Sequence, residues 1–156
     1  MPFIGIVSEE NVENCIRKQL EKLDFKESNI LFLKEKSIEN IKNITFETII
    51  ITKEFKNEEM LKKLIQKAKY VIINSDIKGN LKLIENINAE IITYGFNSKA
   101  TITASSVEED EIMICLQRNL KTKDGKNIEP EEIRVPLYEN TNCSMAIGTI
   151  LLIYGK

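Results

Sequence analysis

The 156-residue sequence contains no histidine. Imidazole is the side chain that most often transfers protons near neutral pH, and it is also the commonest metal ligand in proteins. Any chemistry performed by this chain must therefore proceed without imidazole.

A strong net charge is also missing. The chain has 22 basic and 24 acidic residues, which leaves a net charge of -2. A domain that binds nucleic acid normally carries a basic surface, and single-strand binders add aromatic side chains that stack on bases. The scattered lysines are expected on solvated helix faces without such aromatic neighbours, as at Lys34, Lys36, Lys62, Lys63, Lys67 and Lys69. We therefore expect no nucleic-acid partner.

Paired cysteine motifs and long apolar runs are absent as well. The three cysteines are odd in number and far apart, which favours reduced, mostly buried thiols in a cytoplasmic protein. The first residues show no signal-peptide pattern. The longest apolar window, residues 146–154, is about half of the roughly 18 residues that a membrane-spanning helix needs. We expect a cytoplasmic chain that does not enter a membrane.

The first part of the chain, residues 1–97, alternates short apolar runs with amphipathic segments. This pattern is typical of an α/β protein in which right-handed crossovers join parallel strands. We predict a Rossmann-like, mostly parallel sheet with helices on both faces. The predicted strands are residues 3–7, 29–33, 46–52, 70–73 and 90–93, and the predicted helices are residues 8–23, 57–69 and 80–85 with a helical turn at 37–41.

The second part, residues 98–156, changes to alternating strands and tight turns. Strands are predicted at 101–105, 111–117 and 133–137, with a turn at 123–126, and together they form an antiparallel β-meander. The final segment, 143–154, is apolar on nearly every side and is expected to be a buried helix. With no linker or repeat, the whole chain, 1–156, is predicted to be a single domain.

Residues 70–156 resemble a known family. The order VIINSD, helix, IITYGFN, alternating strands, RVPL and ENTNCSMAIGTILLIYG is similar to the second half of the ATP-binding central domain of the Mur ligases, which build peptidoglycan precursors. Tyr94-Gly95-Phe96 is the most specific short piece of this resemblance. The family then implies a phosphate-binding loop after the first strand.

That loop departs from the family pattern. Residues 8–13, Ser-Glu-Glu-Asn-Val-Glu, contain no glycine, Val12 stands near the position of the family lysine, and carboxylates replace the phosphate contacts. Lys53 replaces a family asparagine, Glu35 matches a metal-binding glutamate only after a one-residue shift, and Cys143 replaces the second asparagine of the adenine segment. The resemblance thus implies a degenerate scaffold without triphosphate binding, cofactor, metal or catalytic residues.

The candidate site is the crevice beyond the carboxyl ends of the predicted parallel strands, where such sheets bind ligands. Besides the six candidate residues given below, Thr52, Lys53 and Ser75 are expected at the rim of this crevice. The crevice would suit a small polar or cationic ligand or a basic segment of a partner. The alternative is that these residues only cap helices and end strands; a metal pair formed by Asp76 with Glu9 or Glu10 lacks further ligands. Cys143 is interpreted as a packed thiol rather than an activated one. The ligand-binding candidates are Ser8, Glu9, Glu10, Asn74, Asp76 and Asn140.

Two functions follow as expectations. The first is a non-catalytic Mur-ligase-like domain that acts as a binding, assembly or regulatory protein connected with cell-wall metabolism, through a protein partner or self-association. The alternative is a nucleotide- or small-ligand-binding domain, or an accessory part of an ATP-dependent ligase, that uses the crevice through Asn140.

Overall fold

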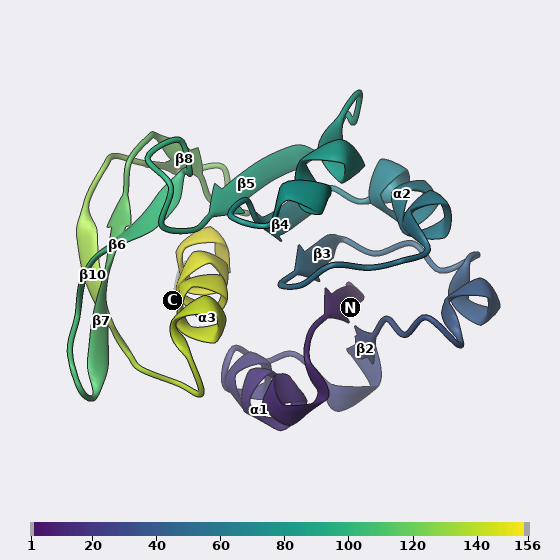
Figure 1. The fold of residues 1–156 in the computed structure, drawn as a ribbon, viewed down its shortest axis with the longest axis horizontal. Helices are drawn as coiled ribbons and strands as arrows, with labels where there is room; N and C mark the ends of the chain where they lie inside the picture. Colours follow the sequence, from purple (N-terminus) through teal and green to yellow (C-terminus); the bar gives the residue numbers. More distant parts are fainter. Residues whose placement is uncertain (1, 155–156) are drawn as a thin grey trace.

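Within residues 2–154, which the computed structural model describes, eight strands form one mixed sheet that curves around the last helix (Figure 1). The predicted domain of 1–156 extends beyond this range at residues 1, 155 and 156. A separate two-stranded hairpin, β8 (Leu120–Lys121) and β9 (Asn127–Ile128), turns through Gly125 at a φ of 83°. The strands of the main sheet are β1 (Ile4–Val7), β2 (Ile30–Phe32), β3 (Thr48–Ile51), β4 (Tyr70–Asn74), β5 (Glu90–Tyr94), β6 (Ile102–Val107), β7 (Glu111–Leu116) and β10 (Glu132–Pro136).

The strand order is β10-β7-β6-β5-β4-β3-β1-β2. All pairs from β2 to β6 are parallel, and β7 and β10 add to the β6 edge as antiparallel strands. The predicted α/β class, mostly parallel sheet and appended antiparallel strands are therefore confirmed. The chain moves from β1 to β2 on one side and then returns to β3 on the other side of β1, so the winding direction reverses between β1 and β3.

The helices lie on both faces of the sheet (Figure 1). Apolar side chains alternate between the two faces along the central strands, for example Ile50 on one face and Ile49 and Ile51 on the other. One face packs against α1 and α3, and the other packs against α2, η3 and η4. The elements are α1 (Glu13–Lys22), α2 (Glu58–Lys67), α3 (Thr141–Tyr154) and the 3-10 helices η1 (Glu10–Val12), η2 (Glu27–Asn29), η3 (Ile38–Ile41) and η4 (Lys78–Ile84).

The predicted first helix, residues 8–23, is only partly correct. The chain forms the 3-10 turn η1 before α1, and the side chain of Ser8 caps neither helix. The predicted helix at 80–85 is also a 3-10 helix, η4, rather than an α-helix. In contrast, Asn57 caps α2 as expected, because its side chain accepts a hydrogen bond from the Met60 amide at 3.2 Å.

Helix α3 is buried, as its apolar composition predicts. Ten of its 14 residues are buried between β4–β7, β10 and α1. A Cβ atom at Gly148 would stand 2.3 Å from the Cδ1 atom of Ile114, so glycine lets the helix lie close to β7. None of the helices in residues 2–154 is long and apolar enough to cross a membrane.

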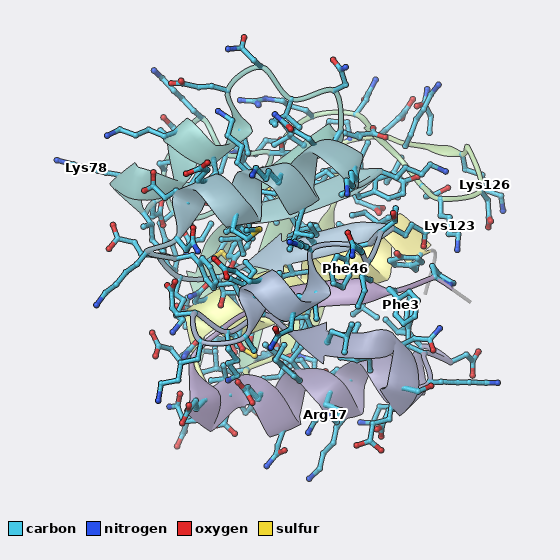
Figure 2. All side chains as sticks on the ribbon, turned by 90° about the vertical axis from the view of Figure 1, so that its right-hand side faces the viewer. Phe3, Arg17, Phe46, Lys78, Lys123 and Lys126 are labelled. Carbon is cyan, nitrogen blue, oxygen red and sulfur yellow. The ribbon has the colours of Figure 1, made fainter. Side chains whose placement is uncertain are left out.

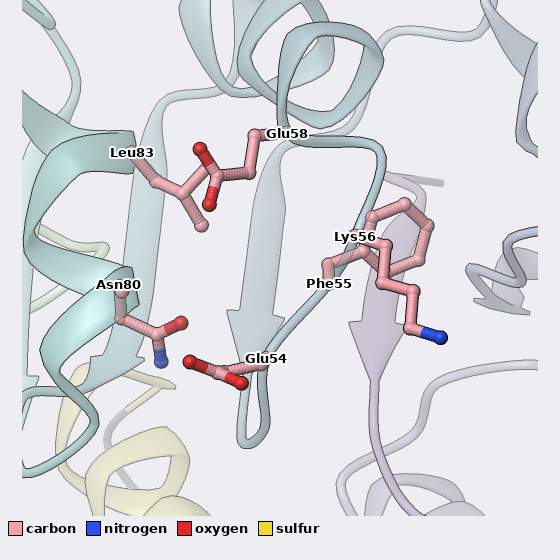
Figure 3. A pocket seen from close by; sticks show the side chains of 7 residues that line it. Glu54, Phe55, Lys56, Glu58, Asn80 and Leu83 are labelled. Atoms are coloured by element: carbon pink, nitrogen blue, oxygen red, sulfur yellow. The ribbon is translucent and has the colours of Figure 1, made fainter.

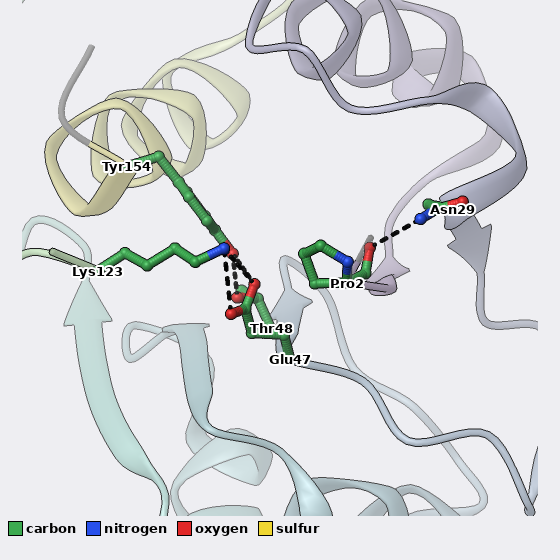
Figure 4. A network of polar contacts seen from close by, with 6 residues as sticks. All are labelled: Pro2, Asn29, Glu47, Thr48, Lys123 and Tyr154. Atoms are coloured by element: carbon green, nitrogen blue, oxygen red, sulfur yellow. Dashed lines mark hydrogen bonds and ion pairs between the residues drawn. The ribbon is translucent and has the colours of Figure 1, made fainter.

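The C-terminal end of α3 is hydrogen-bonded to the start of β3, at the end of the sheet where the parallel strands begin (Figure 4). The Tyr154 hydroxyl lies 2.7 Å from the Thr48 hydroxyl and donates to the Glu47 carboxylate at 3.2 Å. Lys123 forms an ion pair with the same carboxylate at 3.3 Å. Figure 2 shows lysines such as Lys78 and Lys126 extending outward from this packed body.

Candidate functional site

The other end of α3 joins the carboxyl ends of three strands through Asn142. Its side-chain amide donates to the Thr52 carbonyl at 2.8 Å, just beyond β3. Its side-chain oxygen accepts two hydrogen bonds, from the side-chain NH₂ of Asn74 at 3.1 Å and from the Tyr94 hydroxyl at 2.5 Å. Asn74 is the last residue of β4, and Tyr94 is the last residue of β5. Burial raises the pKa of Tyr94 well above its ordinary value, so the phenol remains a donor. We call these four residues the Asn142 network.

Two of the predicted ligand residues, Asn74 and Asp76, accept hydrogen bonds from backbone amides in the turns after β4 and β5. Asn74 accepts from the Asp76 amide at 2.9 Å. Asp76 accepts from the amides of Phe96 at 2.7 Å and Asn97 at 3.1 Å, and also from the Asn97 side chain at 2.7 Å. Desolvation alone would raise the pKa of Asp76, but these hydrogen bonds together lower it. Asp76 thus holds the turn after β5 as a carboxylate.

The predicted ligand residue Asn140 caps α3. Its side-chain oxygen accepts from the Cys143 amide at 2.8 Å, as an N-cap does. Cys143 itself is 2% exposed, and burial, which is the largest cause, raises the pKa of its thiol to about 12. The burial of the side chain confirms the interpretation of Cys143 as a packed thiol. The raised pKa agrees with it, because such a thiol supplies little thiolate near neutral pH.

The remaining predicted residues, Ser8, Glu9 and Glu10, follow β1. Ser8 is 5% exposed, and within residues 2–154 its hydroxyl has no hydrogen-bond partner. Glu9 and Glu10 are exposed. Five of the six predicted residues thus fall into two groups: Asn74, Asp76 and Asn140 hold the turns and the helix start around Asn142, whereas Ser8 and Glu10 line a pocket near β1. The sixth, Glu9, is exposed beside Glu10 and does not line this pocket.

This pocket has a volume of about 430 Å³ and lies at the carboxyl ends of β1, β2 and β3, beside the point where the winding direction reverses. Open α/β sheets bind ligands at such a reversal, because the loops there diverge and leave a crevice. We call it the switch-point pocket. Its lining residues are Ser8, Glu10, Leu33, Lys34, Glu35, Lys36, Ser37, Lys53 and Phe55.

Some of the charged side chains in the switch-point pocket already have partners within the protein. Lys34 pairs with Glu13 at the start of α1. Both oxygens of the Glu35 carboxylate accept backbone amides, from Lys56 at 2.5 Å and from Asn57 at 3.0 Å. In the described part of the chain, the amines of Lys36 and Lys53 have no such partner, which leaves them free for a ligand.

Sequence reasoning missed Lys36 as a site residue and assigned both Lys34 and Lys36 to a solvated helix face. The structure corrects this, because both residues lie in the turn between β2 and η3. Their position immediately after the apolar run of β2 was the available signal, since the carboxyl ends of parallel strands share one edge of the sheet.

Sequence reasoning also left Asn142 out of the candidate list. It considered Asn140 instead, although the two residues stand only two positions apart at the start of α3. The metal pair of Asp76 with Glu9 or Glu10 is considered from the sequence and set aside for lack of further ligands. Residues 2–154 contain no group of three or more acidic or cysteine side chains that could hold a metal ion.

Comparison of the chain with models of known protein families and with curated protein sequences found no match. The resemblance to the Mur ligases therefore stays a prediction from residues 70–156.

Proposed function

We propose that this chain is a non-catalytic binding domain of Mur-ligase-like ancestry that takes a small anionic ligand in the switch-point pocket. The fold proposed with it is Rossmann-like in the broad sense, since the order β2-β1-β3-β4-β5 is one of the two common orders of doubly wound sheets. A connection with cell-wall metabolism belongs to the same proposal and rests on the resemblance.

The observation that carries the proposal is the unpartnered Ser8 hydroxyl in a pocket with two free amines. A buried hydroxyl without a hydrogen bond destabilises the folded chain, so a ligand oxygen that accepts from it is favoured. Lys36 and Lys53 supply positive charge to the same pocket, and charge-assisted hydrogen bonds to anions are the stronger class.

The ligand should be small and carry one or two negative charges. Glu10 lines the same pocket, and its carboxylate would repel the spread charge of a triphosphate. The loop after β1 also lacks the glycines that let backbone amides surround phosphates. The absence of histidine removes the usual proton-transfer group near neutral pH and supports binding without catalysis.

We expect inorganic phosphate to produce saturable amide shifts at Ser8 and Lys53 in a two-dimensional NMR titration at constant ionic strength. Lys53→Ala should weaken this binding about fivefold, because it removes one partly screened charge contact. Lys78→Ala is the matched control, since Lys78 is exposed and lies outside the pocket.

Equal effects of Lys53→Ala and Lys78→Ala would contradict the ligand site. The proposal that the domain is non-catalytic is tested separately, by calorimetry with ATP and Mg²⁺. Micromolar ATP binding coupled to hydrolysis would contradict it.

A second candidate is an assembly or regulatory role through a protein partner or a second copy. It is favoured by four large apolar side chains that remain exposed among the described residues, of which Phe96 after β5 is the most exposed at 53%; the others are Leu81 and Val107 at 48% and Phe3 at 36%. If the chain self-associates there, light scattering should show a mass that rises with concentration and that Phe96→Ser returns to the monomer value. A monomer mass at every concentration would exclude self-association.

A further inference from the structure

A second pocket lies on the other side of the loop between β3 and α2 (Figure 3). It has a volume of about 190 Å³, and its wall includes the side chains of Glu54, Glu58, Asn80, Phe55 and Leu83. Phe55 also lines the switch-point pocket, so one phenyl ring belongs to both walls. We call the second space the carboxylate pocket.

Asn80 presents an unused acceptor to the carboxylate pocket. The residue is only 1% exposed, and its side-chain NH₂ donates to the Asn74 carbonyl at 3.0 Å. This bond determines the orientation of the amide, because the reversed amide would place two oxygens against each other. Within residues 2–154 the Asn80 side-chain oxygen accepts no hydrogen bond from the protein, and it is not one of the side-chain atoms that are sealed from solvent without a partner, so it is open to a donor from a ligand.

Two carboxylates accompany this oxygen. The Oε1 atom of Glu54 lies 3.0 Å from the position that a Cβ would take at Gly79, next to Asn80 in the chain. In Figure 3, Asn80 points toward Glu54, the Glu58 carboxylate lies above them at the start of α2, and the Lys56 amine is directed away. Among the described residues, neither Glu54 nor Glu58 has an ion-pair partner.

We propose that the carboxylate pocket binds a primary ammonium group. An ammonium has three N–H donors, and the pocket offers three acceptor groups, namely Glu54, Glu58 and the Asn80 oxygen. The alkyl stem of the ligand would lie against Phe55 and Leu83, as the stem of a lysine lies on an apolar surface. The ligand class is therefore a primary alkylamine, either free or as the side chain of a lysine in a peptide.

This site is independent of the proposed anion site, because it uses other polar groups. The probe is butylammonium, followed by the amide shifts of Gly79 and the side-chain NH₂ shifts of Asn80. We expect saturable shifts with butylammonium and none with tetramethylammonium, which has the same charge and no N–H donor. Glu54→Gln and Glu58→Gln should each weaken binding about three- to fivefold.

The matched control is Glu59→Gln, which removes an exposed carboxylate from the next residue of α2 outside the pocket and should leave binding unchanged. Equal shifts with tetramethylammonium, or an equal loss in Glu59→Gln, would overturn the proposal in favour of general charge attraction. A Gly-Gly-Lys-Gly-Gly peptide distinguishes the sources: binding of the peptide supports a lysine side chain, and binding of butylammonium alone supports a free amine. Failure of both probes would also overturn the site.

Discussion

Asn142→Ala is expected to lower the free energy of unfolding by about 3–4 kcal/mol, because it leaves several buried groups unpaired at once. The Thr52 carbonyl and the Tyr94 hydroxyl lose their partner, and the Asn74 amide loses its acceptor. Tyr94 is fully buried, and Asn74 and Thr52 are 7% and 4% exposed. Urea denaturation followed by circular dichroism measures the change.

Two neighbouring variants separate the Asn142 network from ordinary helix capping. Asn140→Ala removes only the N-cap of α3 and should cost about 1 kcal/mol. Tyr94→Phe should also cost about 1 kcal/mol, because the Asn142 oxygen still accepts from Asn74. If Asn142→Ala costs no more than Asn140→Ala, the network does not hold the strand ends together.

Gly95→Ala is expected to lower the free energy of unfolding by about 2–3 kcal/mol through strain and a steric clash. Gly95 has a φ of 155°, which side-chain-bearing residues rarely adopt. A Cβ atom there would stand 2.6 Å from the nearer carboxylate oxygen of Asp76. The clash cannot be relieved without moving Asp76 away from the amides of Phe96 and Asn97.

Gly125→Ala is the matched control for backbone strain alone. Gly125 also has a positive φ, 83°, but a Cβ there would meet no atom within 4 Å, so the cost should be about 1 kcal/mol. In an Asp76→Ala background, Gly95→Ala should lose most of its clash and therefore cost less than in the native chain. A cost of Gly95→Ala equal to that of Gly125→Ala would show that the contact with Asp76 is unimportant.

The hydrogen bonds of the Asp76 carboxylate make the stability of the folded chain depend on pH. Because the folded-state pKa of Asp76 is lowered, the stabilisation by its carboxylate is present above the unfolded-state pKa and is lost as the pH falls through the folded-state value. The destabilisation caused by Asp76→Ala should therefore shrink in urea titrations repeated at increasingly acidic pH.

Local patterns predict the elements that are apolar on both faces. Strand β3 carries Ile49, Ile50 and Ile51, and a run of this kind fits only a strand covered on both sides. The uniformly apolar α3 is likewise predictable as a buried helix. The 3-10 geometry of η1 and η4 is not predictable, because their short segments satisfy their backbone groups in either helical form.

The candidate site is less predictable than the fold, because it depends on strand order and on helix register. Periodicity indicates that β1, β2 and β3 exist, but it does not indicate that β1 lies between the other two. That order brings Ser8, Lys36 and Lys53 around one pocket. Similarly, only the register of α3 against the sheet decides that Asn142, rather than Asn140, faces the strand ends.

The attachment of α3 at both ends has a consequence for folding kinetics. Asn142 reaches back 90 residues to Thr52, and Tyr154 reaches back 106 residues to Thr48. Such distant pairings raise the contact order, and chains with high contact order cross their folding barrier slowly. Because β3–β5 and α3 hold one another, their amide hydrogens should exchange together in one cooperative opening, whereas those of the β8–β9 hairpin should exchange earlier through local fraying.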